Sequence, residues 1–226
     1  MLITPTAPRQ ADRTRRVRDP ERTRGRILAA ALREFADKGF AGARVARIAR
    51  RARINKRMLY HYFGNKDDLF REILGRKLGE RMSWATAAPD DPAGSLAYWF
   101  DVACRDTDWV RLMQWEALEA GTGELSRQAE REQASRWAID QVRARQAAGT
   151  LADDVDPAQM LLSMVALTMF PVAFPQITRL VTGLAPADPR FQEQCTEFLR
   201  RFARRLEPEA HRLPDAEASR EAIVNV

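Results

Sequence analysis

The side chains whose types and spacing best suit chemistry in this sequence are cationic and aromatic. Leu59 and Phe63 are four residues apart, so they would share one face of a helix. Arg57, Tyr60 and His61 would then fall on the opposite face. Such a helix would pack its apolar face on a folded domain and turn cations and rings outward. This arrangement suits contacts with nucleic-acid phosphates and base edges.

A second short amphipathic helix is predicted just before this one. Val45, Ile48, Ala49 and Ala52 recur at offsets of three and four residues, the period of one helix face. Asn55 then provides an N-cap for the next helix, because its side chain accepts a backbone N–H two or three residues on. Two short helices joined by a tight connection predict a helix-turn-helix, whose second helix lies in the DNA major groove.

A longer helix is predicted upstream of these two. Asp19, Pro20 and Glu21 have the residue types of an N-cap followed by an acidic first turn. This helix would run to about Lys38, with Gly39 as its C-cap. Three helices in so short a stretch predict one compact module.

The predicted helices span TRGRILAAALREFADKGF (23–40) and VARIARRARINKRMLYHYFGNKDDLF (45–70). These segments resemble the DNA-binding domain of the TetR family of transcriptional repressors. The most specific part is LYHYF, followed by Lys66 and Leu69. The resemblance implies a repressor that binds DNA as a dimer and takes a small-molecule effector in a second domain.

The resemblance also implies which residues contact double-stranded DNA. The predicted set is Arg44, Arg47, Lys56, Arg57, Met58, Tyr60, His61, Tyr62 and Lys66. Lys56, Arg57 and Met58 match the start of the recognition helix, where the family reads bases. Lys66 matches a lysine that commonly binds the DNA backbone. Tyr62 has a second interpretation, as a residue that mostly belongs to the core.

The sequence departs from the family's pattern at two places. The family often has Thr or Ser at the positions of Ala43 and Arg44, where the hydroxyl caps a helix and contacts phosphate. Ala43 can do neither, and Arg44 can do only the second. The family usually has Gly where Arg53 stands. If the backbone there is left-handed, a non-glycine residue costs about 1 kcal/mol.

Charge is distributed unevenly along the chain, whose formal net charge is +6. Residues 1–81 hold 22 Lys and Arg against 9 Asp and Glu, a net +13. Residues 82–226 hold 15 against 22, a net −7. A basic first third joined to an acidic remainder predicts a polyanion partner for the first part only.

The whole chain is predicted to be all-α, with a helix-turn-helix domain followed by a larger helical domain. We expect a disordered basic arm (1–18), a DNA-binding domain (19–66), an effector-binding and dimerisation domain (67–206) and a polar tail (207–226). A long helix from Lys66 would couple the two domains. Apolar spacing predicts further helices at 93–105, 108–120, 124–148, 158–181 and 190–206.

Tryptophans gather in the second domain, where four of the five lie between residues 96 and 140. Aromatic and methionine side chains at helical spacing more often form core than line a pocket. As a group, however, they would enclose an apolar cavity between helices, the usual place for a small ligand in a helical bundle. The predicted ligand-binding residues are Trp99, Phe100, Cys104, Trp109, Met113, Trp137, Met164 and Phe170.

The last two predicted helices indicate a homodimer. Helix 158–181 is apolar on nearly every side, and helix 190–206 has an apolar stripe. A helix that is apolar on all sides must be covered on all sides, and a second subunit is the natural cover in a domain of this size. We therefore expect these two helices from each subunit to form a four-helix interface.

Other function classes have less support. Cys104 and Cys195 are far apart and suit buried free thiols in a reducing cytoplasm. His61 lacks the neighbours of a metal ligand or a general base, so we expect no metal, no cofactor and no enzyme activity. The most apolar run, 160–174, is shorter than the roughly 20 residues that span a bilayer, so no membrane partner is expected. A transcriptional activator and a sequence-blind DNA-binding protein stay open as alternatives.

Overall fold

The computed structural model describes residues 19–121 and 123–206. Within these residues the chain forms ten α-helices, one short 3-10 helix and no β-strand, which confirms the predicted all-α fold. The predicted basic arm (1–18) and polar tail (207–226) lie outside the described residues.

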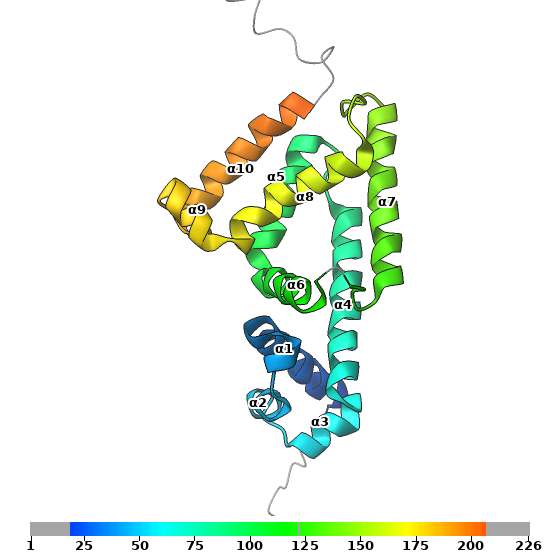
Figure 1. The fold of residues 1–226 in the computed structure, drawn as a ribbon, viewed down its shortest axis with the longest axis vertical. Helices are drawn as coiled ribbons and strands as arrows, with labels where there is room; N and C mark the ends of the chain where they lie inside the picture. Colours follow the sequence, from blue (N-terminus) through cyan, green and yellow to red (C-terminus); the bar gives the residue numbers. More distant parts are fainter. Residues whose placement is uncertain (1–18, 122, 207–226) are drawn as a thin grey trace, which may run out of the picture.

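The first four helices build the N-terminal module (Figure 1). They are α1 (Pro20–Gly42), α2 (Val45–Arg51), α3 (Lys56–Phe63) and α4 (Lys66–Ala87). Their apolar faces meet in one core, in which Ile27, Phe35, Ile48, Leu59 and Leu69 are fully buried. This core holds α2 and α3 in the predicted helix-turn-helix arrangement.

Capping contacts fix where α1 and α3 begin, as predicted, whereas α1 ends at Gly42 and not near Lys38. The Asp19 side chain accepts the backbone N–H of Arg22 at 3.1 Å. The Asn55 side chain accepts the backbone N–H of Met58 at 2.8 Å, at the start of α3. Each such cap contributes about 1 kcal/mol. Gly39 interrupts the regular path of α1 with a left-handed φ of 68°, which glycine adopts without steric cost.

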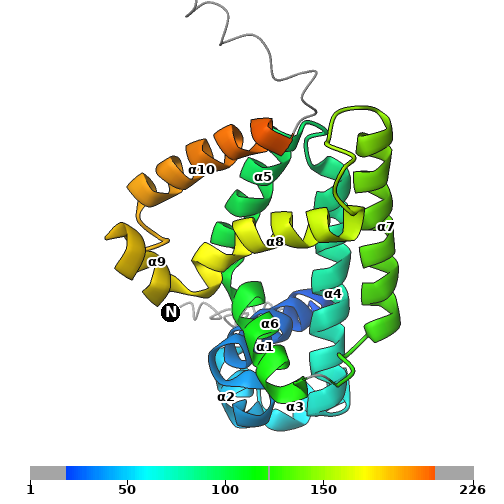
Figure 2. The ribbon, with the colours of Figure 1, turned by 45° about the horizontal axis from the view of Figure 1, so that its top comes forward.

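Six further helices build the larger domain. They are α5 (Pro92–Arg105), α6 (Thr107–Ala120), α7 (Gln128–Ala147), α8 (Pro157–Ala173), α9 (Pro175–Thr182) and α10 (Pro189–Ala203). Figure 2 shows α7 alongside α4, and α8 crossing from α7 toward α9. Helix α5 packs against both α8 and α10. Leu96, Phe100, Phe191 and Leu199 are buried in the core of this domain.

Two predicted helices need correction. The predicted helix 158–181 is broken into α8 and α9, which are bent by 87° relative to each other. The break lies at Phe174 (φ −121°, ψ 66°), because Pro175 has no N–H to donate and disfavours a helical residue before it. The predicted helix 124–148 begins only at Gln128, since Arg127 before it has a left-handed φ of 61°.

Among the described helices, none alone is both long and apolar enough to span a membrane. Within that same part of the chain, α8 and α9 taken together, across their 87° bend, are the one pair that meets the length and composition.

The two domains share apolar packing as well as a chain connection. Trp109 and Leu112 of α6 are buried in the same core as α1 to α4. The first half of α4 contributes Leu69 and Leu74 to that core, whereas its second half faces the larger domain. The domain boundary between residues 66 and 67 stays a prediction, and it falls at the start of a helix that both domains use.

Both cysteines are half-buried free thiols, Cys104 on α5 and Cys195 on α10. Burial raises the pKa of each thiol to about 11, and the neighbouring Cys195 and Asp101 add to the shift at Cys104. At neutral pH, well below that pKa, each sulfur is almost entirely protonated, and only the thiolate reacts. We expect reaction with a disulfide reagent at neutral pH to be about 100-fold slower than for free cysteine and to accelerate as the pH rises. A rate equal to that of free cysteine would contradict this result.

Candidate nucleic-acid interface

Helix α3 presents the two chemically different faces that its sequence predicts. Leu59 and Phe63 are buried in the core of the N-terminal module. The exposed side chains of α3 are Lys56, Arg57, Tyr60 and His61. Met58 and Tyr62 are half-buried. Lys56 and Arg57 have no ion-pair partner among the residues that the structure describes, so their charges face solvent; their contact with DNA stays a prediction.

The remaining predicted DNA-contacting residues are Arg44, Arg47 and Lys66, and the last two already contact other groups of the N-terminal module. Arg44 is exposed at the N-cap of α2. Arg47 is half-buried, and its Nε lies 3.4 Å from a carboxylate oxygen of Glu34. Lys66 is half-buried and donates to the carbonyl oxygen of Ala41 at 3.3 Å. A phosphate at Lys66 or Arg47 would therefore share the cation with an existing partner, which lowers the gain from that contact.

Glu34 is a fully buried carboxylate that sequence reasoning missed. Its Oε1 accepts the backbone N–H of Arg44 at 3.3 Å. Its two oxygens lie 3.4 Å from Arg47 Nε and 3.6 Å from Arg51 Nη1. Helix α2 has no capping side chain of its own, as Ala43 leads one to expect. Glu34 therefore supplies, from α1, the acceptor and the negative charge that favour a helix N-terminus.

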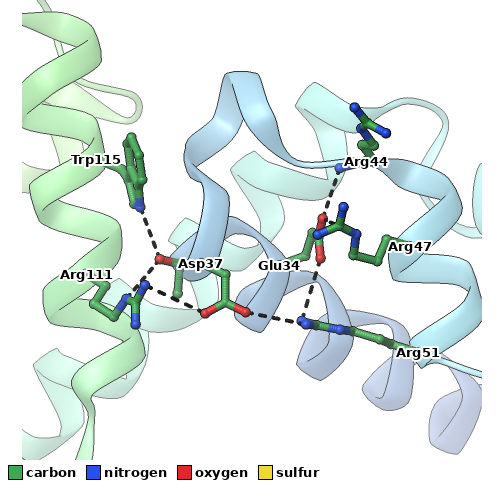
Figure 3. A network of polar contacts seen from close by, with 8 residues as sticks. Glu34, Asp37, Arg44, Arg47, Arg51, Arg111 and Trp115 are labelled. Carbon is green, nitrogen blue, oxygen red and sulfur yellow. Dashed lines mark hydrogen bonds and ion pairs between the residues drawn. The ribbon is translucent and has the colours of Figure 1, made fainter.

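The polar network around α2 continues to α6 of the larger domain (Figure 3). Arg51 Nη2 lies 3.4 Å from one carboxylate oxygen of Asp37, and Arg111 Nη2 lies 3.8 Å from the other. Arg111 Nε and Trp115 Nε1 each donate to the carbonyl oxygen of Ala36 at 3.1 Å. These contacts connect α6, through the end of α1, to the helix that precedes α3.

A cavity of about 510 Å³ lies in the larger domain, between the second half of α4 and helices α5, α7 and α8. Four of the predicted ligand-binding residues line it, namely Trp99, Trp109, Trp137 and Met164. Helix α4 adds wall residues that sequence reasoning missed, among them Leu78, Arg81, Met82 and Ala85. For the apolar ones the signal was present, because Leu78, Met82 and Ala85 continue the helical spacing of α4 beyond its N-terminal core face.

The other four predicted ligand-binding residues do not line this cavity. Phe100 is buried in the core of the larger domain, and Cys104 packs against the same core. Met113 packs against the core of the N-terminal module. Phe170 is 46% exposed, and its ring lies 5.0 Å from the ring of Phe174. Neighbouring residues on a helix point about 100° apart, so one aromatic residue of a pair faces the cavity while the next faces the core.

Comparisons with known proteins agree with this geometry. The family described as bacterial regulatory proteins, tetR family, matches residues 27–73, and the tetracyclin repressor-like C-terminal domain matches residues 91–205. The chain belongs to the TetR family. The predicted family is thereby confirmed, and with it the function class of a transcriptional regulator.

Individual TetR-family relatives extend over most of the chain. The HTH-type transcriptional repressor SCO4008 of Streptomyces coelicolor is 35% identical over 189 residues, which is 84% of this chain and 97% of that protein. The HTH-type transcriptional repressor NicS of Pseudomonas putida is 30% identical over 166 residues, 69% of this chain and 78% of that protein. The crystal structure of the transcriptional regulator SCO4942 of Streptomyces coelicolor has a TM-score of 0.69 at 28% identity, covering 82% of this chain and 98% of that one.

The TetR-family turn between α2 and α3 is left-handed at a non-glycine residue. Arg53 has a φ of 55°, which costs an L-residue with a side chain more than it costs glycine. We expect Arg53→Gly to raise the free energy of unfolding by about 0.5–1 kcal/mol, measured by urea denaturation. Arg50→Gly, within helical α2, is the matched control and should lower it by about 1 kcal/mol. Destabilisation by both substitutions would contradict a strained turn.

The last three helices of this TetR-family chain, with the bend between α8 and α9, carry a group of exposed apolar side chains that we call the C-terminal apolar patch. It consists of Leu162, Val165, Phe170, Phe174, Ile177, Leu180, Val181 and Phe198, each at least 40% exposed. Elsewhere in the described residues, only Tyr60, Leu118 and Val155 are large hydrophobic residues with comparable exposure. Monomeric proteins rarely expose so many neighbouring apolar side chains, so we expect another protein surface to pack against this patch.

Proposed function

We propose that this TetR-family protein is a ligand-responsive repressor that binds a pseudopalindromic DNA operator as a homodimer. The observation that carries the proposal is the outward face of α3, which projects cations and rings from a helix whose other face is buried. This helix is eight residues long and reaches only a few base pairs. Two copies roughly 34 Å apart would read successive turns of the major groove and therefore a symmetric site.

The C-terminal apolar patch supports the dimer. Its residues belong to α8, α9 and α10 and to the bend between α8 and α9, so it lies within the two segments, 158–181 and 190–206, that the sequence assigns to the interface. Burying this patch against a second copy would remove its apolar surface from water, at about 25 cal/mol per Å² of buried area. The bend at Phe174 means that α9 joins the predicted four-helix interface as a separate element.

The effector is proposed to bind in the cavity of about 510 Å³ and to weaken DNA binding by a population shift. Helix α4 contributes both to the cavity wall and to the core under α3. Helix α6 is attached to α1 by Arg111 and Trp115. A ligand that favours a different position of α4 and α6 would change the spacing of the two α3 helices. Its effect on DNA is limited to its differential affinity for the two states.

Arg57→Ala tests the DNA-binding part of the proposal. We expect a selected duplex to bind about 5- to 150-fold more weakly, because a base-reading arginine contributes about 1–3 kcal/mol. Fluorescence anisotropy with excess random-sequence competitor measures the affinity. Arg136→Ala is the control, since Arg136 is exposed on α7 and pairs with Glu132. Equal binding of selected and random duplexes would indicate the sequence-blind alternative instead.

An activator and an enzyme are the remaining alternatives to a repressor. A transcriptional activator would bind DNA in the same way, because operator position decides the sign of regulation. The proposal includes no enzyme activity and a cytoplasmic location, in keeping with relatives that are named as transcriptional repressors. Among the described residues, no group of three or more His, Cys, Asp and Glu side chains is placed to hold a metal ion.

A further inference from the structure

The cavity contains charged side chains that an apolar ligand alone does not explain. Three charged residues line it, namely Arg81, Asp90 and Arg145. Asp90 and Arg145 lie 3.5 Å apart and form an ion pair. These two residues also line a neighbouring surface hollow, which places them at the mouth of the cavity. The ion pair accounts for Asp90 and Arg145, but it does not account for the charge of Arg81.

Arg81 has aromatic neighbours but, within the part of the chain that the structure describes, no carboxylate partner. Its guanidinium carbon lies 5.2 Å from the ring centre of Trp99 and 5.6 Å from that of Trp109, and both rings line the cavity. Among the described residues no ion pair or hydrogen bond is made by its side chain. The negative charge of Asp106 acts on Arg81, but Asp106 accepts hydrogen bonds from Lys77 at 2.9 and 3.0 Å.

Burial makes this unpaired cation costly. The side chain is half-buried, and desolvation lowers the pKa of the Arg81 guanidinium, although an arginine stays charged at neutral pH. A cation that is removed from water gains most from an anion that hydrogen-bonds to it directly. The rest of the wall is mainly apolar, with Met82, Trp137 and Met164 facing the same space.

We propose that the effector is an amphiphilic molecule with an apolar body and one carboxylate, which Arg81 binds. This inference rests on the proposed function and names the chemical class of its effector. The planar guanidinium matches the two oxygens of a carboxylate, and the tryptophans flank it. The apolar body extends toward Trp137 and Met164. A cationic effector is disfavoured, because Arg81 already occupies the neighbourhood of the Trp99 and Trp109 rings and would repel a second cation.

Three probes with the same ten-carbon chain test the head group: decanoate, decanamide and decyltrimethylammonium. Each is titrated into the full chain, with quenching of tryptophan fluorescence as the signal, since three tryptophans line the cavity. We expect decanoate to bind at least 10-fold more tightly than decanamide, and decyltrimethylammonium to bind most weakly. Equal affinities of the acid and the amide would overturn the anion preference while leaving the cavity as an effector site. No binding of any probe would count against both.

Arg81→Met tests the residue. It should weaken decanoate about 10- to 100-fold and leave decanamide within about 3-fold, because a hydrogen bond to a charged group contributes about 1.5–3 kcal/mol. Arg76→Met is the matched control on the same helix, where Arg76 is exposed and pairs with Glu80. Arg81→Lys keeps the charge and should retain part of the preference. An unchanged preference in Arg81→Met would overturn the assignment. If Arg81→Met did not fold, the comparison of decanoate with decanamide in the unaltered chain would still test the preference for a carboxylate.

Discussion

Leu162→Asp is expected to separate the dimer into monomers and to weaken operator binding at least 100-fold. Leu162 is 62% exposed on α8, on the face opposite the buried Met160 and Met164. In the proposed dimer this face is covered, so the substitution would bury a carboxylate without a partner, at a cost of several kcal/mol. Light scattering after size exclusion measures the mass, and fluorescence anisotropy measures the DNA affinity.

Leu118→Asp is the matched control for this prediction. Leu118 is 77% exposed on α6, outside the C-terminal apolar patch. The same change of side chain there should leave a dimer with unaltered DNA affinity. If Leu162→Asp also remained a dimer at micromolar concentration, the interface would have to lie elsewhere.

Glu34→Gln is expected to lower the free energy of unfolding by about 2 kcal/mol. Removing one partner of a buried ion pair costs about 3–5 kcal/mol, but the side chains of Arg47 and Arg51 are 33% and 39% exposed and can turn to solvent, which reduces the loss. The amide also removes a negative charge from the N-terminus of α2. Since α2 supports α3, we expect operator affinity to fall about 10-fold at a temperature where the protein stays folded.

Urea denaturation measures this effect, with Asp37→Asn as the control. Asp37 takes part in the same network, but its side chain is 40% exposed. Exposed ion pairs contribute about 0.2–1 kcal/mol, so Asp37→Asn should cost less than half as much. An equal loss for the two substitutions would show that burial of Glu34 does not set its contribution.

Local features of the fold could be predicted from the sequence, because interactions between residues close in the sequence determine them. The faces of α3 follow from the four-residue spacing of Leu59 and Phe63. The start of α3 follows from Asn55, whose side chain makes the expected cap. The left-handed backbone at Arg53 was expected from the family resemblance, since the family usually has glycine at this position. Each of these depends on contacts within a few residues.

Features that depend on packing between distant segments could not be predicted from the sequence. Glu34 looked like one more charged residue on a long helix, and only the fold brings Arg47 and Arg51 to it. The break at Phe174 required weighing two prolines, of which Pro171 stays inside α8 whereas Pro175 begins α9.

Only half of the predicted ligand-binding residues line the cavity, for a related reason. Aromatic spacing identified Trp99 as apolar and helical, but the same spacing held for Phe100, which faces the core instead. Arg81 was invisible as a ligand-binding residue, because nothing in its local sequence distinguishes it from the paired Arg76 five residues earlier. A charge without a partner is recognised only when all of its neighbours are known.

The most direct test of an effector-released repressor is the affinity of the full chain for a labelled operator duplex with and without a saturating cavity ligand. Fluorescence anisotropy gives the affinity, and tryptophan quenching establishes that the cavity is occupied. We predict that a saturating ligand raises the Kd for the operator about 5- to 150-fold, the usual range of coupling between two sites. An operator Kd that stays the same with every ligand that fills the cavity would contradict the account.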